Sequence, residues 1–132
     1  MEQRVDPDKE QVNSFKYAFD GLIHALREGR NFRIQALLGI LVLILAWIFN
    51  FARFEWVLLF LTISLVLTAE LLNTVIELAV DLASQEKILP KAKIAKDVSA
   101  ASVLLISIFS VIVGLVLFIP HIQEAISALE VF

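Results

Sequence analysis

Residues 56–81 read WVLLFLTISLVLTAELLNTVIELAVD, and this stretch decides the fold. Its first half carries no charge, whereas its second half places Glu70, Asn73, Glu77 and Asp81 three or four residues apart. The apolar spacing stays helical, and at about 100° per residue the four polar side chains fall within one stripe. The sequence therefore predicts one long helix that begins as a membrane span and then acquires an acidic face.

Two further apolar stretches flank this helix, at about residues 34–52 and 98–119. The first has no charged residue, and at about 1.5 Å per residue it can cross a hydrocarbon core of about 30 Å. The chain of 132 residues is 59% hydrophobic with a mean hydropathy of +0.83. A soluble domain of this size could not bury so much apolar surface. Three membrane spans are predicted, at about 34–52, 56–83 and 98–119.

The N-terminal part is polar over residues 1–12 and amphipathic over residues 13–29. Asn13 and Ser14 suit the N-cap of a helix whose apolar residues form one stripe. We expect this helix to lie in the membrane interface, with a helix of a soluble bundle as the alternative. The predicted fold class is an all-α membrane protein. A single domain at 13–132 comprises the interfacial amphipathic helix and three transmembrane helices.

Positive charge is distributed unevenly along the chain. Ten of the eleven Lys and Arg residues lie in the N-terminal segment or in the loop at 84–97, and Arg53 alone lies on the other side. The positive-inside rule therefore predicts a cytoplasmic N-terminus and 84–97 loop, with the C-terminus outside. A net charge of −3 suggests no nucleic-acid partner. The chain has no cysteine and only four scattered glycines, which excludes thiolate chemistry and a glycine-rich phosphate loop.

The acidic stripe is the first candidate for chemistry, because ionisable groups near the membrane core are costly and usually functional. Glu70 and Glu77 lie about 10.5 Å apart along the helix axis, so one metal ion is not easily shared by both. The deeper Glu70 suits a base for a lipid hydroxyl, and Glu77 suits Mg²⁺ that accompanies a nucleotide phosphate. Asn73, between them, could orient either partner. The alternative is a helix end that extends into water, with Asp81 paired to a basic loop residue.

A second polar group, Lys93, Lys96 and Asp97, precedes the third span. Lysines at this place suit phosphate oxygens or anionic lipid headgroups, although positive-inside topology alone would also explain them. The small residues Ala100 and Ala101 follow and would allow close helix packing.

Three segments resemble blocks of the bacterial membrane diacylglycerol kinase and undecaprenol kinase family. They are AELLNTVIELAVD at 69–81, AKDVSAASVL at 95–104 and NFRI at 31–34. The blocks have the order and spacing of the family, and the resemblance covers about residues 14–119. It implies a homotrimer, with sites between subunits, that transfers the γ-phosphoryl group of MgATP to a lipid alcohol in the bilayer.

The resemblance also implies roles for individual residues. It assigns the catalytic base to Glu70 and a metal ligand to Glu77. The nucleotide-binding residues that it implies are Glu77, Asn73, Lys96 and Asp97. The expected contacts of the lipid acceptor are Glu70, Arg33 and Ala100.

One departure from the family pattern concerns the metal site. The family usually has a glutamate two residues before the Asn of its NFR block, but that place is Gly29 here and the acid is Glu28. A one-residue shift turns a helical side chain by about 100°. Glu28 is therefore the expected substitute metal ligand, provided that the helix end adjusts. Gln35 stands where relatives often have a His or an acid.

The function predicted first is phosphorylation of undecaprenol to undecaprenyl phosphate in the bacterial cytoplasmic (inner) membrane. FRI, EWVLL and FSVIVGLVLFIP look more like the undecaprenol-kinase branch than the diacylglycerol-kinase branch. Phosphorylation of diacylglycerol is the alternative. A catalytically degenerate relative or a small transporter with an acidic intramembrane site is the alternative of another class.

Overall fold

The structure is a computed structural model that describes residues 7–85, 87 and 89–130, with side chains described from residue 13 onward. Its elements, in order, are the helices α1 (Pro7–Glu28), α2 (Arg30–Ile48), α3 (Arg53–Ser84) and α4 (Pro90–Glu130). The described residues contain no strand. The helices α2, α3 and α4 are long and apolar enough to cross a membrane. The predicted class, an all-α protein with three spans, is confirmed.

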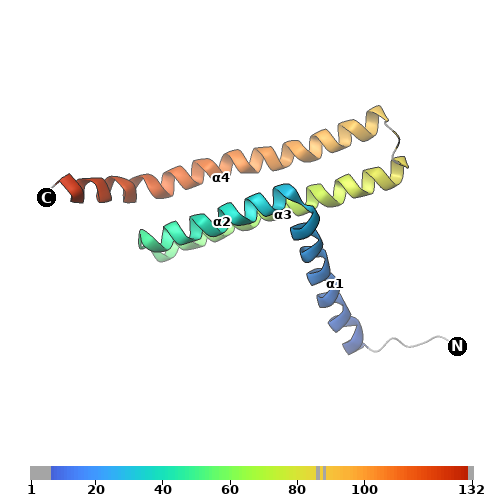
Figure 1. The fold of residues 1–132 in the computed structure, drawn as a ribbon, viewed down its shortest axis with the longest axis horizontal. Helices are drawn as coiled ribbons and strands as arrows, with labels where there is room; N and C mark the ends of the chain where they lie inside the picture. The colour runs from blue at the N-terminus through green and yellow to red at the C-terminus, as the bar shows by residue number, and fades with distance from the viewer. Residues whose placement is uncertain (1–6, 86, 88, 131–132) are drawn as a thin grey trace.

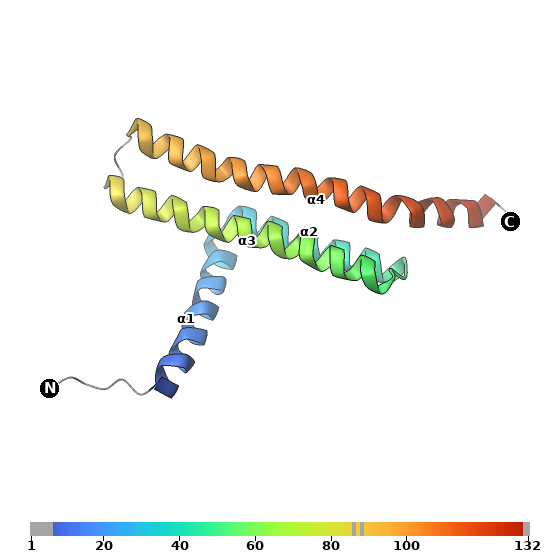
Figure 2. The same ribbon diagram turned by 180° about the vertical axis from the view of Figure 1, so that it is seen from behind.

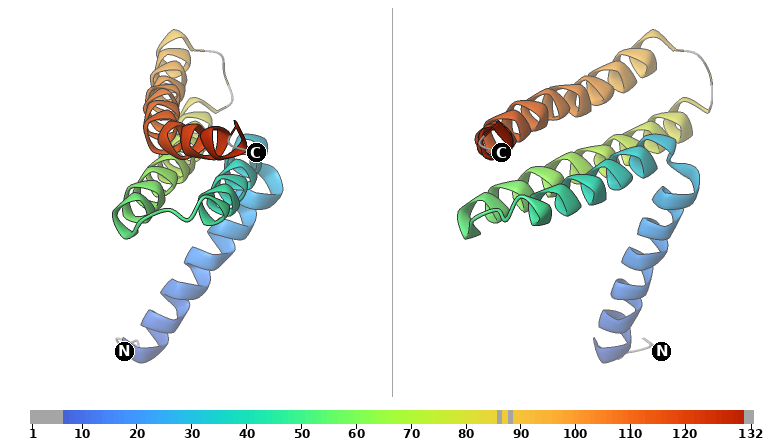
Figure 3. Two further views of the ribbon diagram at one scale, coloured as in Figure 1. Left: turned by 90° about the vertical axis from the view of Figure 1, so that its left-hand side faces the viewer. Right: turned by 60° about the vertical axis from the view of Figure 1, so that its left-hand side comes forward.

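Helix α3 is the centre of the arrangement. Helix α2 runs antiparallel beside it, and α4 lies along it over much of its length (Figures 1 and 2). Helix α1 leaves the other three at a steep angle, as an N-terminal helix lying in the interface would (Figure 3). Most of the large apolar side chains of α2 to α4 are exposed in the single chain. Lipid or other protein surfaces must cover them in the membrane.

The first helix begins earlier than its sequence pattern predicts. Helix α1 begins at Pro7, so part of the predicted polar tail 1–12 is helical and Asn13 and Ser14 do not cap it. Proline suits a first helical turn, because its fixed φ matches the helix and its missing N–H has no partner to lose there. Residues 1–6 lie outside the described part of the chain.

The last helix is much longer than its predicted span at 98–119. Helix α4 begins at Pro90, so most of the predicted 84–97 loop is helical, and it continues through Pro120 to Glu130. An internal proline removes one backbone hydrogen bond but does not end this helix. At about 1.5 Å per residue α4 exceeds the hydrocarbon thickness, so its two ends reach beyond the apolar core.

The hydrophobic core lies at the end of the bundle where α2 turns into α3. Its buried residues are Ala46, Phe51, Leu59 and Leu117. The ring of Phe51 stacks on His121 with the ring centroids 4.7 Å apart. His121 Nε2 lies 3.0 Å from Oε1 of Glu55. His121 is thus half-buried, and its contacts fasten α4 to the α2–α3 hairpin.

Candidate active site

A single residue separates α1 from α2, and it directs the end of α1 toward α3. Gly29 has φ −79° and ψ 96°, and its N–H donates to the carbonyl of Ala25 at 2.9 Å. Ala25 and Phe32 are buried on either side of the turn. Burial of these two side chains fixes the direction in which α1 leaves α2. Glu28, the last residue of α1, consequently lies at the same cleft as the acidic stripe of α3.

This cleft has a volume of about 320 Å³ and opens at the α1–α2 junction. Its polar lining residues are His24, Glu28, Arg30, Asn31, Glu70, Asn73, Thr74, Glu77 and Asp81. The fold therefore brings together four of the predicted site residues, Glu28, Glu70, Asn73 and Glu77. We call this space the acidic cleft.

Glu70 is the buried carboxylate of the acidic cleft, with 5% of its surface exposed. Its Oε2 accepts a hydrogen bond from Nε2 of Gln35 at 3.2 Å, and its backbone carbonyl accepts one from Thr74 Oγ1 at 3.0 Å. A buried carboxylate needs such a partner, because burial without one is costly. Gln35 thereby fixes the rotamer of Glu70. The sequence singled out Gln35 as a departure from the family and missed its contact with Glu70.

Glu77 has a different environment at the open side of the acidic cleft. Its side chain is exposed, and its Oε1 accepts a hydrogen bond from Nδ2 of Asn73 at 3.0 Å. The oxygen of the same Asn73 amide, Oδ1, is buried and has no hydrogen-bond partner within the described residues. Asn73 therefore orients Glu77, and its buried Oδ1 keeps an unused capacity to accept a hydrogen bond.

The donor set of the acidic cleft fits a magnesium ion that arrives with phosphates. Among the described residues no three Asp, Glu, His or Cys side chains converge as a complete metal site. Mg²⁺ in proteins is commonly held by one or two carboxylates, with water and phosphate oxygens completing the shell. Glu28 and Glu77 border one cleft, and Asn73 Oδ1 is a third oxygen there without a partner.

A second cleft of about 280 Å³ lies where α3 leads into α4. It is lined by Lys87, Lys93, Lys96 and Asp97, and it shares Asp81 with the acidic cleft. Lys96 Nζ lies 2.5 Å from Asp81 Oδ1, so the predicted pairing of Asp81 with a basic residue is confirmed. Lys93 Nζ pairs with Asp97 Oδ2 at 2.6 Å. We call this space the basic cleft.

Two predicted acceptor contacts line neither cleft. Arg33 is exposed and donates from Nη1 to the carbonyl of Arg27 at 2.6 Å. Ala100 is exposed on α4. Conversely, His24 lines the acidic cleft, although it is not among the candidate site residues predicted from the sequence. Its position four residues before Glu28, on the same helix face, is the signal that could have identified it.

Comparisons of the sequence with known proteins place this chain in a family. The sequence pattern described as prokaryotic diacylglycerol kinase matches residues 16–118. A diacylglycerol kinase of Synechocystis sp. is 42% identical over 107 residues, which cover 81% of this chain and 61% of that protein. An undecaprenol kinase of Bacillus subtilis is 39% identical over 107 residues, covering 81% of this chain and 86% of the relative. A diacylglycerol kinase of Pseudomonas aeruginosa is 34% identical over 94 residues, covering 71% and 76%.

The fold and the site define a class: small prokaryotic membrane proteins of three spans, with a buried carboxylate beside an acidic cleft, whose relatives are named as lipid kinases. The chain belongs to the prokaryotic diacylglycerol kinase family. The resemblance found in the sequence blocks is confirmed. The relatives carry two names for their lipid acceptor, so the family alone leaves the acceptor open.

Proposed function

We propose that this chain is a lipid kinase that transfers the γ-phosphoryl group of MgATP to a membrane alcohol, with undecaprenol as the first acceptor and diacylglycerol as the alternative. The observation that carries the proposal is the buried Glu70 carboxylate, held by Gln35 at the inner edge of a cleft that Glu28 and Glu77 also line. A base for a lipid hydroxyl must be reached from the lipid side, and the phosphoryl donor must be reached from water.

The proposed reaction divides between the two sides of the acidic cleft. Glu70 accepts the proton of the lipid hydroxyl as the hydroxyl oxygen bonds to the γ-phosphorus. The bond between the γ-phosphorus and the bridging oxygen breaks, and ADP leaves with the electron pair. Glu28, Glu77 and Asn73 would hold Mg²⁺, which shields the charge on the phosphates. Lys96 and Asp97, in the adjoining basic cleft, are the proposed contacts for the rest of the nucleotide.

The proposal includes an orientation and an assembly. Ten of eleven Lys and Arg residues favour a cytoplasmic N-terminus and 84–97 segment and an outside C-terminus, in a bacterial inner membrane. This orientation opens both clefts toward cytoplasmic ATP. The exposed apolar faces of α2 to α4 are compatible with a homotrimer, as the resemblance implies.

The test measures phosphate transfer by purified protein in lipid nanodiscs, with MgATP and either undecaprenol or a diacylglycerol. Wild-type protein is compared with Glu70→Gln, and Glu124→Gln on the exposed C-terminal part of α4 is the matched control. Transfer to a lipid alcohol that Glu70→Gln abolishes and Glu124→Gln retains supports the proposal. Wild-type protein that phosphorylates neither lipid overturns it and favours a degenerate relative.

A further inference from the structure

The C-terminal part of α4 extends beyond the packed end of the bundle. His121 contacts Phe51 and Glu55, so it lies level with the turn between α2 and α3. Residues 122–130 continue the helix past this turn by about 13.5 Å, at about 1.5 Å per residue (Figure 1). We call them the C-terminal segment. The family pattern matches residues 16–118, so the C-terminal segment lies outside the part of the chain that the family explains.

The C-terminal segment is amphipathic. Its large apolar side chains belong to Ile122, Ile126 and Leu129, which are four and three residues apart and are exposed. At about 100° per residue, these three side chains fall within one stripe about 60° wide. Glu124 lies about 160° around the helix from Ile126, on the opposite face. The segment therefore presents a narrow apolar stripe that the described residues leave uncovered.

This stripe keeps the register of a heptad repeat that begins inside the span. Ile108, Ile112, Leu115 and Ile119 are exposed and lie four, three and four residues apart. The same alternation continues from Ile119 through the three apolar residues of the C-terminal segment. Steps of three and four residues mark the a and d positions of a coiled coil, and every a position here is isoleucine. Within the span almost every face is apolar, so the register becomes informative where the C-terminal segment maintains it.

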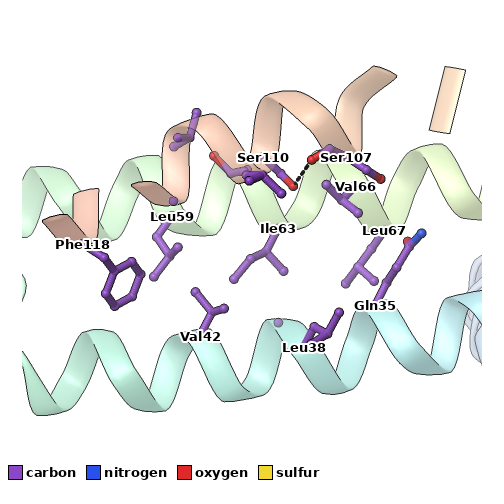
Figure 4. A pocket seen from close by; sticks show the side chains of 15 residues that line it. Gln35, Leu38, Val42, Leu59, Ile63, Val66, Leu67, Ser107, Ser110 and Phe118 are labelled. Carbon is purple, nitrogen blue, oxygen red and sulfur yellow. Dashed lines mark hydrogen bonds between the residues drawn. The ribbon is translucent and has the colours of Figure 1, made fainter. Parts of the chain in front are cut away.

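Another face of α4 makes the contacts within the chain. Ser110 and Phe118 line the apolar space between α2, α3 and α4, and Leu117 belongs to the hydrophobic core (Figure 4). Ile119 lies about 160° around the helix from Leu117, so the heptad stripe faces away from this core. Pro120 occupies a b position, off the stripe, and the axis of α4 bends there (Figure 3). Copies of the chain related by symmetry share this bend, so equivalent residues stay aligned.

A second copy of the chain fits this stripe better than lipid does. The C-terminal segment lies beyond the predicted span and carries two glutamates without a Lys or Arg, so anionic headgroups do not attract it. Copies inserted in one membrane have the same orientation, so their α4 helices are parallel and equivalent residues meet. Isoleucine at a, with isoleucine or leucine at d, suits such a parallel contact. Glu124 at f points away from a partner, and Glu130 at e would face Ala125 at g, so like charges do not oppose the contact.

We propose that the heptad stripe of α4 joins copies of this chain, and that their C-terminal segments form a short parallel coiled coil beyond the membrane span. So short a helix does not associate by itself in water, but copies held in one oligomer have a high effective concentration. The contact lies at the packed end of the bundle, away from the acidic and basic clefts. It is independent of phosphoryl transfer.

The first test uses disulfide cross-linking, which is direct because the chain has no cysteine. Ile126→Cys at a, and the control Glu124→Cys at f, are oxidised in isolated membranes before any detergent is added. Ile126→Cys should form disulfide-linked dimers about tenfold faster, because residues held in contact have a higher effective concentration than residues that collide. Equal rates at the two positions would overturn the proposal. So would the absence of a disulfide in Ile126→Cys, and shielding from a water-soluble maleimide would then show that lipid covers the stripe.

The second test adds the same charge on the stripe and beside it. Ile126→Glu should make the purified oligomer dissociate at a lower SDS concentration than the wild type, because each copy would bury a carboxylate in the contact. Ser127→Glu, at the exposed b position, is the matched control and should behave like the wild type. Unchanged dissociation in Ile126→Glu, or an equal shift in Ser127→Glu, would overturn the proposal. Neither test measures phosphate transfer, so a protein that phosphorylates no lipid would sink the proposed function alone.

Discussion

At the scale of single residues, the two glutamates of the acidic stripe differ in environment more than in position. Glu70 is buried and receives a hydrogen bond from Gln35, whereas Glu77 is exposed and receives one from Asn73. A group that takes a proton from a lipid hydroxyl must be shielded and oriented, and a group that binds a hydrated ion must be accessible to water. The two environments support the division of roles that the sequence predicts.

This division predicts opposite kinetic effects for two isosteric changes. Glu70→Gln should reduce kcat by about 10²–10⁴-fold with nucleotide affinity retained, because a general base contributes about that much. Glu77→Gln should weaken MgATP binding and recover partly at high Mg²⁺ or with Mn²⁺. Nucleotide affinity and turnover are measured separately for both variants. Loss of nucleotide binding in Glu70→Gln alone would reverse the assignment, and full turnover in both would make the stripe structural.

A second prediction concerns Glu28 as the substitute metal ligand. Glu28→Gln should raise the Mg²⁺ concentration needed for half-maximal activity, because one of the two carboxylates proposed to hold the ion, Glu28 and Glu77, loses its charge. Asp20→Asn, on the exposed surface of α1, is the control. The Mg²⁺ dependence of turnover is the measurement. Identical dependence in wild-type protein and Glu28→Gln would show that the ion is held without α1.

At the scale of the elements, the Lys96–Asp81 pair joins the C-terminal end of α3 to the N-terminal end of α4. The two side chains are 37% and 45% exposed, and exposed ion pairs contribute at most about 1 kcal/mol. The pair therefore contributes little to stability. In the proposed function, Asp81 pairs with the ammonium group of Lys96 and so competes with nucleotide phosphate for it.

This competition leads to a third prediction. Asp81→Asn should leave thermal unfolding in detergent nearly unchanged and should lower KM for MgATP, because Lys96 is released toward the nucleotide. Lys96→Met should raise the same KM. The experiment compares KM and unfolding temperature for both variants. A large loss of stability in Asp81→Asn, or an unchanged KM in Lys96→Met, would contradict the assignment of Lys96 to the nucleotide.

The membrane spans were predictable from the sequence, because their apolar composition alone requires a lipid environment. An uncharged apolar run such as 34–52 is long enough to cross the hydrocarbon core and is stable when lipid surrounds it. The existence of the spans therefore follows from composition. Helix ends do not follow in the same way. Helix α4 continues through Pro120 and α1 begins at Pro7, because proline limits a helix only where its missing N–H or its ring meets a conflict.

The helical period predicts only the part of the site that lies on one helix, whereas Glu28 of α1 was predicted from the family resemblance. Glu70, Asn73, Glu77 and Asp81 follow from the helical period of α3. The contact of Gln35 with Glu70 and the place of His24 in the acidic cleft depend on how α2 and α1 pack against α3. The position of α1 depends on the one-residue turn at Gly29, and that of α2 on the connection at 49–52 between α2 and α3. Periodicity describes neither connection.

At the scale of the whole molecule, the two ends of the bundle have different tasks. The end with Phe51, Leu59 and His121 is packed and aromatic, and it holds three helices together. The other end is polar, open and built around two clefts. For the proposed kinase, this arrangement would allow the polar end to open locally toward a nucleotide while the packed end preserves the bundle.

The orientation of the molecule is a fourth prediction. A reporter that is active only in the cytoplasm should be inactive when fused after Phe132 and active when fused before Met1, because positive charge is concentrated at the cleft end. A reporter active only outside is the complementary control. An active cytoplasmic reporter after Phe132 would place both clefts on the side without ATP.

The homotrimer is a fifth prediction. A complex in mild detergent or nanodiscs should have three times the mass of one chain, and dissociation should reduce activity if subunits shield one another's clefts from lipid. Mass and turnover are measured on the same fractions. A fully active monomer would show that one chain, which supplies all the described lining of the acidic cleft, is sufficient.

The turn at Gly29 also constrains how this sequence can evolve. A Cβ at this position would lie 2.5 Å from the carbonyl oxygen of Ala25, a backbone atom that cannot move without changing the α1–α2 angle. Gly29→Glu, which would reinstate the acid of the usual family pattern, therefore has to be preceded by a change that opens the turn. With Glu28 in its proposed role as metal ligand, we expect positions 28 and 29 to be epistatic, because an acid can return to position 29 only after the turn has opened.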